Sequence, residues 1–299
     1  MKAYHIPVLL KESIEGLNIN PEGTYVDVTY GGGGHSSEIL KKLTTGKLIA
    51  FDQDRDAVEN VINDERLLFV NHNFRYLTNF LRYYNIGKVD GLLADLGVSS
   101  HHFDVAKRGF SYRYDGELDM RMNQKSSISA KHVLNVYHEK QLYSIFKLYG
   151  EISNASKLVN VIANYRKDNE IRTINQFKEV ISSCMPKNKE NKYLSKVFQA
   201  LRIEVNGEVD SLKDLLMQSG NVIKKSGRLV VITYHSIEDR LVKNYIKKGK
   251  FEGEVEKDFY GNIQVPFNAV NKKVIIPNED EIETNVRARS AKLRIAERL

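Results

Sequence analysis

The chain has little cysteine and no long apolar run. Cys184 is the single cysteine among 299 residues, so neither a disulfide framework nor a thiolate zinc site can form within the chain. Residues 6–10 (IPVLL) are a short apolar stretch, and later stretches such as 229–233 are only as long as a strand. A signal peptide or a membrane span needs a longer run. We therefore expect a cytoplasmic chain without a membrane segment.

The positive charge of the chain is concentrated in one segment. Residues 107–203 contain 18 Lys and Arg against 9 Asp and Glu, whereas all other residues contain 27 against 29. The formal net charge of +7 therefore comes from the middle of the chain. Tyrosines such as Tyr112, Tyr143 and Tyr193 lie among these cations, an arrangement that suits unpaired bases and phosphates. A solvated, lysine-rich helical surface is the alternative, and the composition leaves both open.

Two kinds of hydrophobic periodicity divide the chain. Between residues 24 and 95, predicted strands at 25–30, 47–51, 67–70 and 89–94 alternate with helical patterns at 36–43, 55–62 and 76–84. This alternation predicts a parallel sheet with crossover helices. Only helical patterns follow, at 130–148, 153–167, 174–184 and 194–203, with Ser129, Ser153 and Thr173 as N-caps. A strand returns at 227–233, between helices at 207–225 and 237–247.

We therefore predict an α/β domain that is interrupted by a basic helical domain. The α/β domain takes residues 1–106 and 204–299, and the inserted domain takes residues 107–203. The positive charge falls in the inserted domain, which makes that domain the candidate for substrate binding.

A glycine-rich turn follows the first predicted strand, at residues 27–35 (DVTYGGGGH). Glycines permit positive φ angles and let the backbone approach a ligand closely. Asp52 ends the second predicted strand, 21 residues beyond Gly31, where a carboxylate can accept hydrogen bonds from the ribose of a nucleoside cofactor. NAD sites share these features, but Ser36 stands where a dinucleotide fingerprint has its third glycine. The pattern therefore favours S-adenosylmethionine over NAD.

A second acidic residue, Asp95, ends the fourth predicted strand in the segment 89–100 (VDGLLADLGVSS). Ligands of open α/β sheets bind beyond the carboxyl ends of the strands, so Asp95 should face the same site as the glycine turn. Methyl transfer to an amine needs in-line geometry and an acceptor for the amine N–H groups, and a carboxylate suits this role. His235 follows the fifth strand and either faces the site or precedes a helix capped by Ser236. No metal site is expected, because His35 and His235 lack ligand spacing.

Motifs throughout the chain resemble the bacterial family named ribosomal RNA small subunit methyltransferase H. They are residues 5–10 (HIPVLL), 27–36 (DVTYGGGGHS), 95–100 (DLGVSS), 108–111 (RGFS), 118–122 (LDMRM), 198–206 (FQALRIEVN), 234–240 (YHSIEDR) and 287–294 (RARSAKLR). The family methylates the exocyclic N4 of a cytosine in small-subunit (16S) ribosomal RNA. The resemblance implies a class I, Rossmann-like methyltransferase sheet with an inserted, mainly helical domain for substrate recognition.

The resemblance also assigns residues to the cofactor, S-adenosylmethionine. The cofactor contacts that it implies are Gly33, Gly34, His35, Asp52, Phe74, Asp95 and His102. The family usually has glutamine in place of His102 and a larger residue in place of Gly32. Asp95 and His235 are the candidate catalytic residues. An NAD-dependent oxidoreductase and a non-catalytic RNA-binding protein are the alternatives. Ser36 argues against the first, and the complete set of glycines and carboxylates argues against the second.

Several cations are candidates for contact with the substrate RNA. They are Arg108, Lys187, Lys189, Lys192, Lys196, Arg202, Arg240, Arg287 and Arg289. Surface arginine paired with a carboxylate is the ordinary alternative for each of these arginines. The sequence leaves open whether the substrate is naked RNA or the assembled subunit, and whether the chain is a homodimer.

Overall fold

The computed structural model describes residues 7–98, 100–255, 259 and 264–299, which fall into two compact units. The sheet unit comprises Met1–Gly97 and Val209–Leu299, and the helical unit comprises Val98–Glu208. The helical unit is longer at both ends than the insertion expected at 107–203. With Asp104, Glu204 and Glu208 included, its 18 cations stand against 12 carboxylates, a balance of +6. His5, Ile6 and Ser99, from two of the motifs, lie outside the described residues.

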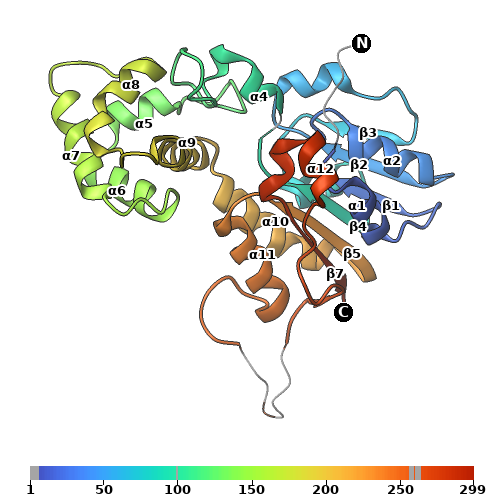
Figure 1. Ribbon diagram of the computed structural model, residues 1–299. Coiled ribbons are helices and arrows are strands. Elements are labelled where there is room, and N and C mark those ends of the chain that lie inside the picture. Colours follow the sequence, from blue (N-terminus) through green and yellow to red (C-terminus); the bar gives the residue numbers. More distant parts are fainter. Residues whose placement is uncertain (1–6, 99, 256–258, 260–263) are drawn as a thin grey trace. The chain divides into compact units, whose positions relative to one another are not determined.

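A seven-stranded sheet forms the centre of the sheet unit (Figure 1), in the order β3-β2-β1-β4-β5-β7-β6. The strands are β1 Thr24–Asp27, β2 Lys47–Phe51, β3 Leu67–Val70, β4 Val89–Asp95, β5 Ile223–Thr233, β6 Phe267–Ala269 and β7 Lys292–Arg298. The strands β3, β2, β1, β4 and β5 pair in parallel, whereas β7 is antiparallel to both β5 and β6. The chain reverses its direction of winding between β1 and β4, which is the topological switch point of a doubly wound sheet. The expected Rossmann-like α/β fold is confirmed.

Both faces of this sheet are buried, as the apolar strands require. Val230 and Ile232 of β5 belong to one hydrophobic cluster with Leu17 of α1 (Leu10–Leu17) and Ile39 of α2 (Gly34–Lys42). The alternate residues of β5 point to the opposite face, and these are buried as well. On that face the ring of Phe51 contacts Phe80 of α3 (Leu77–Tyr83) edge to face at 5.9 Å. Crossover helices therefore hold the strand ends in a fixed arrangement.

The remaining elements of the sheet unit follow the sheet or connect its strands. They are η1 Arg55–Asn60, η2 Phe74–Tyr76, α10 Glu208–Val222, α11 Ser236–Lys248, α12 Glu279–Thr284 and η5 Val286–Ser290. The helical pattern at 55–62 forms the 3-10 helix η1 instead of an α-helix. The pattern at 207–225 ends earlier, because β5 already begins at Ile223. No helix in the described part of the chain is long and apolar enough to cross a membrane.

The buried residues of the helical unit form a hydrophobic cluster of their own. Its elements are α4 Ser100–Asp104, η3 Ala106–Arg108, α5 Ala130–Val136, α6 Glu139–Leu148, α7 Ala155–Tyr165, α8 Ile174–Val180, η4 Ser182–Cys184 and α9 Glu190–Asn206. Phe146, Leu158 and Val197 are fully buried and represent three of these helices in the core. Amphipathic packing of this kind stabilises helices that would be marginal alone.

Local capping explains where these helices begin. The hydroxyls of Ser129 and Thr173 accept the backbone N–H groups of His132 and Gln176, so both predicted N-caps are confirmed. The cap predicted at Ser153 is wrong, because α7 has Asn154 at its N-cap. The single helix expected at 130–148 is also wrong. It divides before His138, whose backbone N–H donates to the side chain of Gln141 at 3.0 Å and starts α6.

Candidate functional site

The predicted acidic residues and the glycine turn meet at one edge of the sheet. The turn follows β1, Asp52 follows β2 and Asp95 is the last residue of β4. Because β1 and β4 are neighbours at the switch point, these groups lie where doubly wound sheets bind ligands. The backbone N–H of Gly31 donates to Asp52 Oδ2 at 2.8 Å, so the turn and the first carboxylate are in direct contact.

Backbone geometry explains the glycines of the turn. Gly31 and Gly33 have φ angles of +53° and +76°, in the left-handed region that favours glycine. A Cβ on Gly33 would also lie 2.6 Å from the hydroxyl oxygen of Tyr30, and a Cβ on Gly34 would overlap the ring of Pro7. The turn then passes directly into α2, whose N-cap is Gly33. The close approach at these two positions is therefore to the chain's own residues.

Asp52 is held with its carboxylate in an acceptor orientation. Its Oδ1 accepts the backbone N–H of Asp54 at 2.8 Å, and its Oδ2 accepts that of Gly31. Burial raises the pKa of Asp52 to about 6, and repulsion from Asp54 and Asp27 also raises it. The two hydrogen bonds lower the pKa and offset part of this shift. Each carboxylate oxygen has a second lone pair. Asp52 can therefore still accept hydrogen bonds from the hydroxyls of a ribose.

A buried carboxylate, Asp27, forms hydrogen bonds with residues on both sides of the glycine turn. Its Oδ2 accepts the hydroxyl of Ser36 at 2.7 Å, and its Oδ1 accepts the backbone N–H of Thr29 at 3.0 Å. Asp27 and Ser36 are 1% and 0% exposed. At the position where a dinucleotide site needs a glycine for close packing, this chain has a hydrogen-bonded hydroxyl. The pairing of Asp27 with Ser36 gives a physical reason for the missing third glycine.

Thr29, Tyr234 and His35 contact Asp95. Its backbone N–H donates to the Thr29 hydroxyl at 2.7 Å, and its Oδ1 accepts the hydroxyl of Tyr234 at 2.8 Å. Its Oδ2 lies 3.8 Å from Nδ1 of His35. Burial raises the pKa of Tyr234 well above its ordinary value, and the neighbouring charge of Asp95 raises it further. Tyr234 therefore stays protonated and donates to Asp95 throughout the range in which enzymes work.

The two candidate histidines have different surroundings. His35 is buried, and its Nε2 lies 3.2 Å from the carbonyl oxygen of Val8. Because a carbonyl can only accept, Nε2 carries the proton and Nδ1 faces Asp95. His235 is the N-cap of α11, so the cap expected at Ser236 is wrong. Its Nδ1 lies 3.4 Å from the backbone N of Glu238 and its Nε2 lies 3.1 Å from Glu238 Oε1.

Phe74 and His102 belong to different units. Phe74 begins η2 just after β3, the strand next to β2, and is partly buried. It therefore lies on the same edge of the sheet as Asp52. His102 lies in the helical unit, where it is 5% exposed and its ring centroid is 4.6 Å from that of Phe110. The cofactor contact of His102 stays a prediction.

The candidate RNA-binding cations divide into internal and exposed groups. Arg108 is buried, and its guanidinium donates to the carbonyl oxygens of Arg121 and Met122 at 3.0 and 3.3 Å. Arg202 forms a two-fold hydrogen bond with Glu208, with both distances 2.8 Å. Exposed cations are Lys187, Lys189, Lys192, Arg240, Arg287 and Arg289, and Lys196 is partly buried. The exposed group is the one that solvent reaches.

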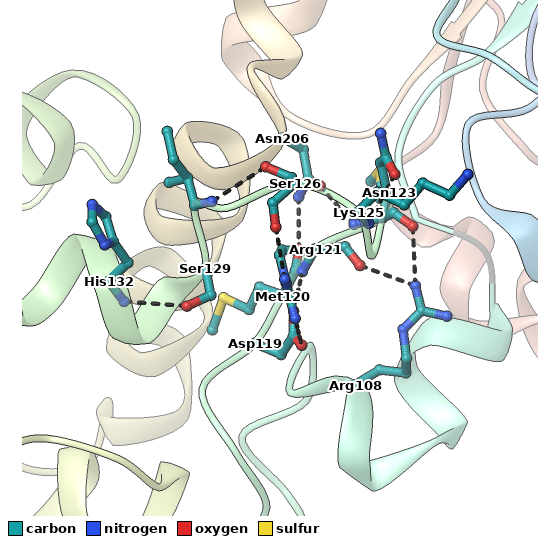
Figure 2. Close-up of polar contacts among 12 residues, drawn as sticks. Arg108, Asp119, Met120, Arg121, Asn123, Lys125, Ser126, Ser129, His132 and Asn206 are labelled. Carbon is teal, nitrogen blue, oxygen red and sulfur yellow. Dashed lines mark hydrogen bonds and ion pairs between the residues drawn. The ribbon is translucent and has the colours of Figure 1, made fainter.

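Figure 2 shows the polar contacts that motif residues of the helical unit make. The guanidinium of Arg121 donates to both carboxylate oxygens of Asp119 at 2.7 Å and to the carbonyl oxygen of Ser126. Asn206 donates to the carbonyl oxygen of Met120 at 2.8 Å and accepts the backbone N–H of Met122 at 2.7 Å. The segment between η3 and α5 contains no helix or strand, so these side chains satisfy its backbone groups.

Two residues of the sheet edge were not among the sequence candidates. Asp27 stands in the glycine motif, but the sequence pattern does not distinguish a buried carboxylate at a strand end from a solvated one. Tyr234 follows the fifth strand next to His235, and the sequence pattern indicates only the histidine as a candidate. The signal for Tyr234 is its place: residues that follow neighbouring parallel strands share one edge, so a tyrosine after β5 lies beside an acid that ends β4.

The sheet order and the two strand-end carboxylates define a Rossmann-like methyltransferase. The model of the MraW methylase family matches residues 2–299, and the chain belongs to this family. The protein named ribosomal RNA small subunit methyltransferase H of Bacteroides fragilis (strain YCH46) is 59% identical over 296 residues, 99% of this chain and 97% of the relative. The protein of the same name from Christiangramia forsetii is 57% identical over 297 residues, 99% and 98% of the two chains.

Among solved structures, an rRNA methylase from Streptococcus thermophilus aligns over 99% of both chains, with a TM-score of 0.45 and 12% identity.

Proposed function

We propose that this chain transfers the methyl group of S-adenosylmethionine to the exocyclic N4 of a cytosine in small-subunit ribosomal RNA. The observation that carries the proposal is the pair of carboxylates, Asp52 and Asp95, on either side of the glycine turn in a chain of the MraW methylase family. The names of the relatives supply the substrate class, ribosomal RNA of the small subunit. Action on ribosomal RNA also supports a place in the cytoplasm.

The residues present suit S-adenosylmethionine better than a dinucleotide. Asp52 offers acceptor lone pairs at the end of β2, where the ribose of a nucleoside cofactor would be held. The glycine turn and Phe74 lie on the same edge, and we assign Gly33, Gly34, His35 and Phe74 to the donor together with Asp52. Ser36 is bonded to Asp27, so the fingerprint that cradles a pyrophosphate is absent from this turn. A dehydrogenase is not favoured.

The chemistry requires little from the protein beyond position and charge. When bound, S-adenosylmethionine supplies an electrophilic methyl group on a sulfonium. The cytosine amine donates its electron pair to the methyl carbon while the carbon–sulfur bond breaks and its electrons pass to sulfur, and the amine then loses one proton. We assign Asp95 to accept an N–H of the amine, which orients the nitrogen lone pair in line with the methyl group. The proton leaves through water or a nearby carboxylate.

The network around Asp95 is built to keep this orientation. Tyr234 donates to one carboxylate oxygen, Thr29 anchors the backbone, and the backbone N–H of Tyr234 is itself fixed by Glu238 Oε2 at 2.9 Å. A carboxylate held in this way loses little freedom when it binds an amine, which is how positioned groups accelerate reactions. His235 and Glu238 support Tyr234 through this contact, so we assign His235 a structural part instead of a catalytic one.

RNA binding is assigned to the exposed cations. Lys187 and Lys189 precede α9, and Lys192 and Lys196 lie one turn apart on it, so the four form a compact basic group in the helical unit. Arg240, Arg287 and Arg289 are exposed in the sheet unit. Phosphates attract such cations without reading the sequence. The buried guanidinium of Arg108 and the carboxylate-bound Arg202 are assigned to the fold instead.

Nucleoside analysis of small-subunit ribosomal RNA from cells with and without this protein tests the proposal. We expect one N4-methylated cytidine to disappear when the gene is deleted and to return with the intact chain. Unchanged modification would refute the proposed substrate. Adding the purified protein to naked RNA and to assembled subunits from the deletion strain then identifies which of the two it accepts.

A further inference from the structure

The sheet unit carries an unusual surface on α3. In the amphipathic helix α3, Leu77 and Leu81 are buried, as expected for the core face. Three tyrosines at the ends of this helix are exposed, although a surface helix normally presents charged residues to solvent. Tyr76 at its N-cap is 43% exposed, and Tyr83 and Tyr84 at its end are 74% and 39% exposed. We call Tyr76, Tyr83 and Tyr84 the α3 tyrosines.

The rings of these tyrosines are arranged as a group. Tyr76 and Tyr83 are seven residues apart, which places them on one side of the helix, two turns from each other. The ring centroids of Tyr83 and Tyr84 lie 5.0 Å apart in an edge-to-face arrangement. The ring of His72 meets that of Tyr76 at 5.0 Å, and the guanidinium of Arg75 lies 5.9 Å from the Tyr76 centroid. The rings therefore present π faces and edges to solvent instead of packing into a core.

The charge of this segment has one sign. Residues 66–89 contain Arg66, Arg75, Arg82 and Lys88 and no Asp or Glu. Arg66 and Arg75 are paired with Asp64 and Asp214, which lie outside the segment. Arg82 and Lys88 are exposed, and among the described residues neither has a carboxylate within ion-pair distance. Cations next to exposed aromatic rings are the combination that binds single-stranded nucleic acid, through phosphate attraction and base stacking.

The position of α3 connects this surface with the proposed site. The 3-10 helix η2 starts at Phe74, directly after β3 on the edge that holds Asp52, and Tyr76 closes it. From there α3 runs back along the sheet unit for about 10 Å. It is fixed there by α10, because Gln218 accepts the backbone N–H of Thr78 at 2.8 Å and donates to the carbonyl of Arg75 at 2.8 Å. A single-stranded RNA that places one base at the sheet edge can therefore extend along the α3 tyrosines.

We propose that the α3 tyrosines, with Arg82 and Lys88, bind a single-stranded segment of the substrate RNA next to the methylated base. The bases stack on the exposed rings and the two cations contact the phosphates. This inference rests on the proposed function for the identity of the RNA. The sheet unit thus holds its own RNA-binding surface, in addition to the lysines of the helical unit.

Binding of a fluorescent single-stranded RNA of roughly 12 nucleotides tests the proposal on the full chain. The variant Tyr83→Ala/Tyr84→Ala should bind at least about fivefold more weakly for each ring that stacks on a base. The matched variant Tyr83→Phe/Tyr84→Phe keeps both rings and should bind as the parent does. Replacing Arg82 and Lys88 by glutamine should lower the salt slope of binding by about 0.7 for each phosphate that the variant no longer binds.

Two controls keep the outcomes distinct. Unchanged S-adenosylmethionine affinity and thermal unfolding show that the alanine variant is folded, since α3 packs through Leu77 and Leu81. Equal RNA affinity of the alanine and phenylalanine variants would overturn the proposal. So would normal binding to RNA with a loss confined to assembled subunits, because the partner would then be a protein. A parent chain that binds RNA through α3 but transfers no methyl group would refute the proposed function and not this surface.

Discussion

The two units of this chain use their polar motif residues in different ways. In the sheet unit, Asp52 and Asp95 stand at strand ends and are partly exposed, with their carboxylates in contact with Gly31 and Tyr234. In the helical unit, Arg121 and Asn206 turn inward and bind backbone groups of a segment without regular structure. Polar motif residues bind backbone groups in both units, but those of the sheet unit also stand at strand ends, where doubly wound sheets bind ligands.

Met120 shows what the helical unit gains from this arrangement. It has a φ angle of +61°, which costs a residue with a side chain on the order of 1 kcal/mol, and its side chain is fully buried. Its carbonyl accepts from Asn206 and its N–H donates to the carbonyl of Arg108 at 3.0 Å. The surrounding bonds impose the strained conformation. The family motifs 108–111, 118–122 and 198–206 thus meet as one structural cluster (Figure 2).

The largest effect is expected on methyl transfer, from a change at Asp95 in the sheet unit. Replacing Asp95 by alanine should lower methyl transfer by at least about a hundredfold, because a positioned acceptor for the amine is lost. RNA affinity, measured by fluorescence titration, should stay within about threefold of the parent. Activity close to that of the parent would show that Asp95 is only a turn residue. The sheet unit would then lack the catalytic acceptor that distinguishes it from the helical unit in this comparison.

Tyr234→Phe tests whether this acceptor needs its support. The variant keeps Asp95 and the ring but removes the 2.8 Å hydrogen bond, so an intermediate loss of about tenfold is expected. Tyr25→Phe is the matched control, because the Tyr25 hydroxyl accepts from Asn20 at the opposite end of β1. Equal activities of the two variants would show that the hydroxyl of Tyr234 has no special part.

The third prediction concerns the architecture of the helical unit. Asn206→Ala removes two hydrogen bonds to the backbone of Met120 and Met122 and should lower the free energy of unfolding by about 2–3 kcal/mol. Chemical denaturation measures this change, with Asn191→Ala, an exposed residue of the same helix, as the control. S-adenosylmethionine affinity should not change. If Asn206→Ala instead abolished S-adenosylmethionine binding and left the free energy of unfolding unchanged, Asn206 would belong to the cofactor site and not to the architecture of the helical unit.

The fourth prediction addresses the basic group of the helical unit. Changing Lys187, Lys189, Lys192 and Lys196 to glutamine should weaken RNA binding and lower its salt slope by about 0.7 for each phosphate released from the protein. Lys11, Lys41, Lys42 and Lys47 are exposed in the sheet unit, and the same change there removes equal charge. If both sets reduce the slope equally, only total charge matters and the four lysines are an ordinary solvated surface.

The smallest effect is a pH dependence at Asp52. Since its pKa is raised to about 6, folding is favoured by its protonated form, and this contribution is lost as the pH rises through about 6. Donor binding has the opposite sign, because the ionised form accepts from the ribose. Affinity for S-adenosylmethionine should therefore fall below pH 6, by up to about tenfold per pH unit.

Calorimetry across pH 5 to about 8 measures this dependence. It should vanish in Asp52→Asn, which binds weakly at every pH. Asp64→Asn is the control, because its hydrogen bonds with Arg66 lower the pKa of Asp64 to about 2 and it does not titrate in this range. A profile that persists in Asp52→Asn would assign the titration to another group.

The sequence predicts the sheet unit well because its strands are short apolar runs between turns. The strands at 47–51 and 67–70 agree with β2 and β3 residue for residue, and β1 ends before its predicted limit because the chain turns toward the glycines after Asp27. β7 is not predicted. Its alternating pattern (KLRIAER) mixes charged and apolar residues, since it is antiparallel and near the edge of the sheet.

The candidate site is predictable only where position along a strand determines position in space. Asp52 and Asp95 follow from this rule, and the structure brings both to the glycine turn. Contacts between side chains, such as Ser36 with Asp27 or Tyr234 with Asp95, depend on rotamers and packing that periodicity does not describe. In the helical unit, periodicity identifies the helices but not the long segment before α5, whose residues are held by side chains from distant positions.

Methyl transfer by the purified chain is the measurement that tests the central claim most directly. The protein is incubated with S-adenosylmethionine carrying a labelled methyl group and with small-subunit ribosomal RNA, and the RNA is then digested to nucleosides for mass analysis. We predict that the label appears in N4-methylcytidine and is absent when Asp95→Ala replaces the parent. Label on another base or on a ribose, or no transfer to either naked RNA or assembled subunits, would contradict the account.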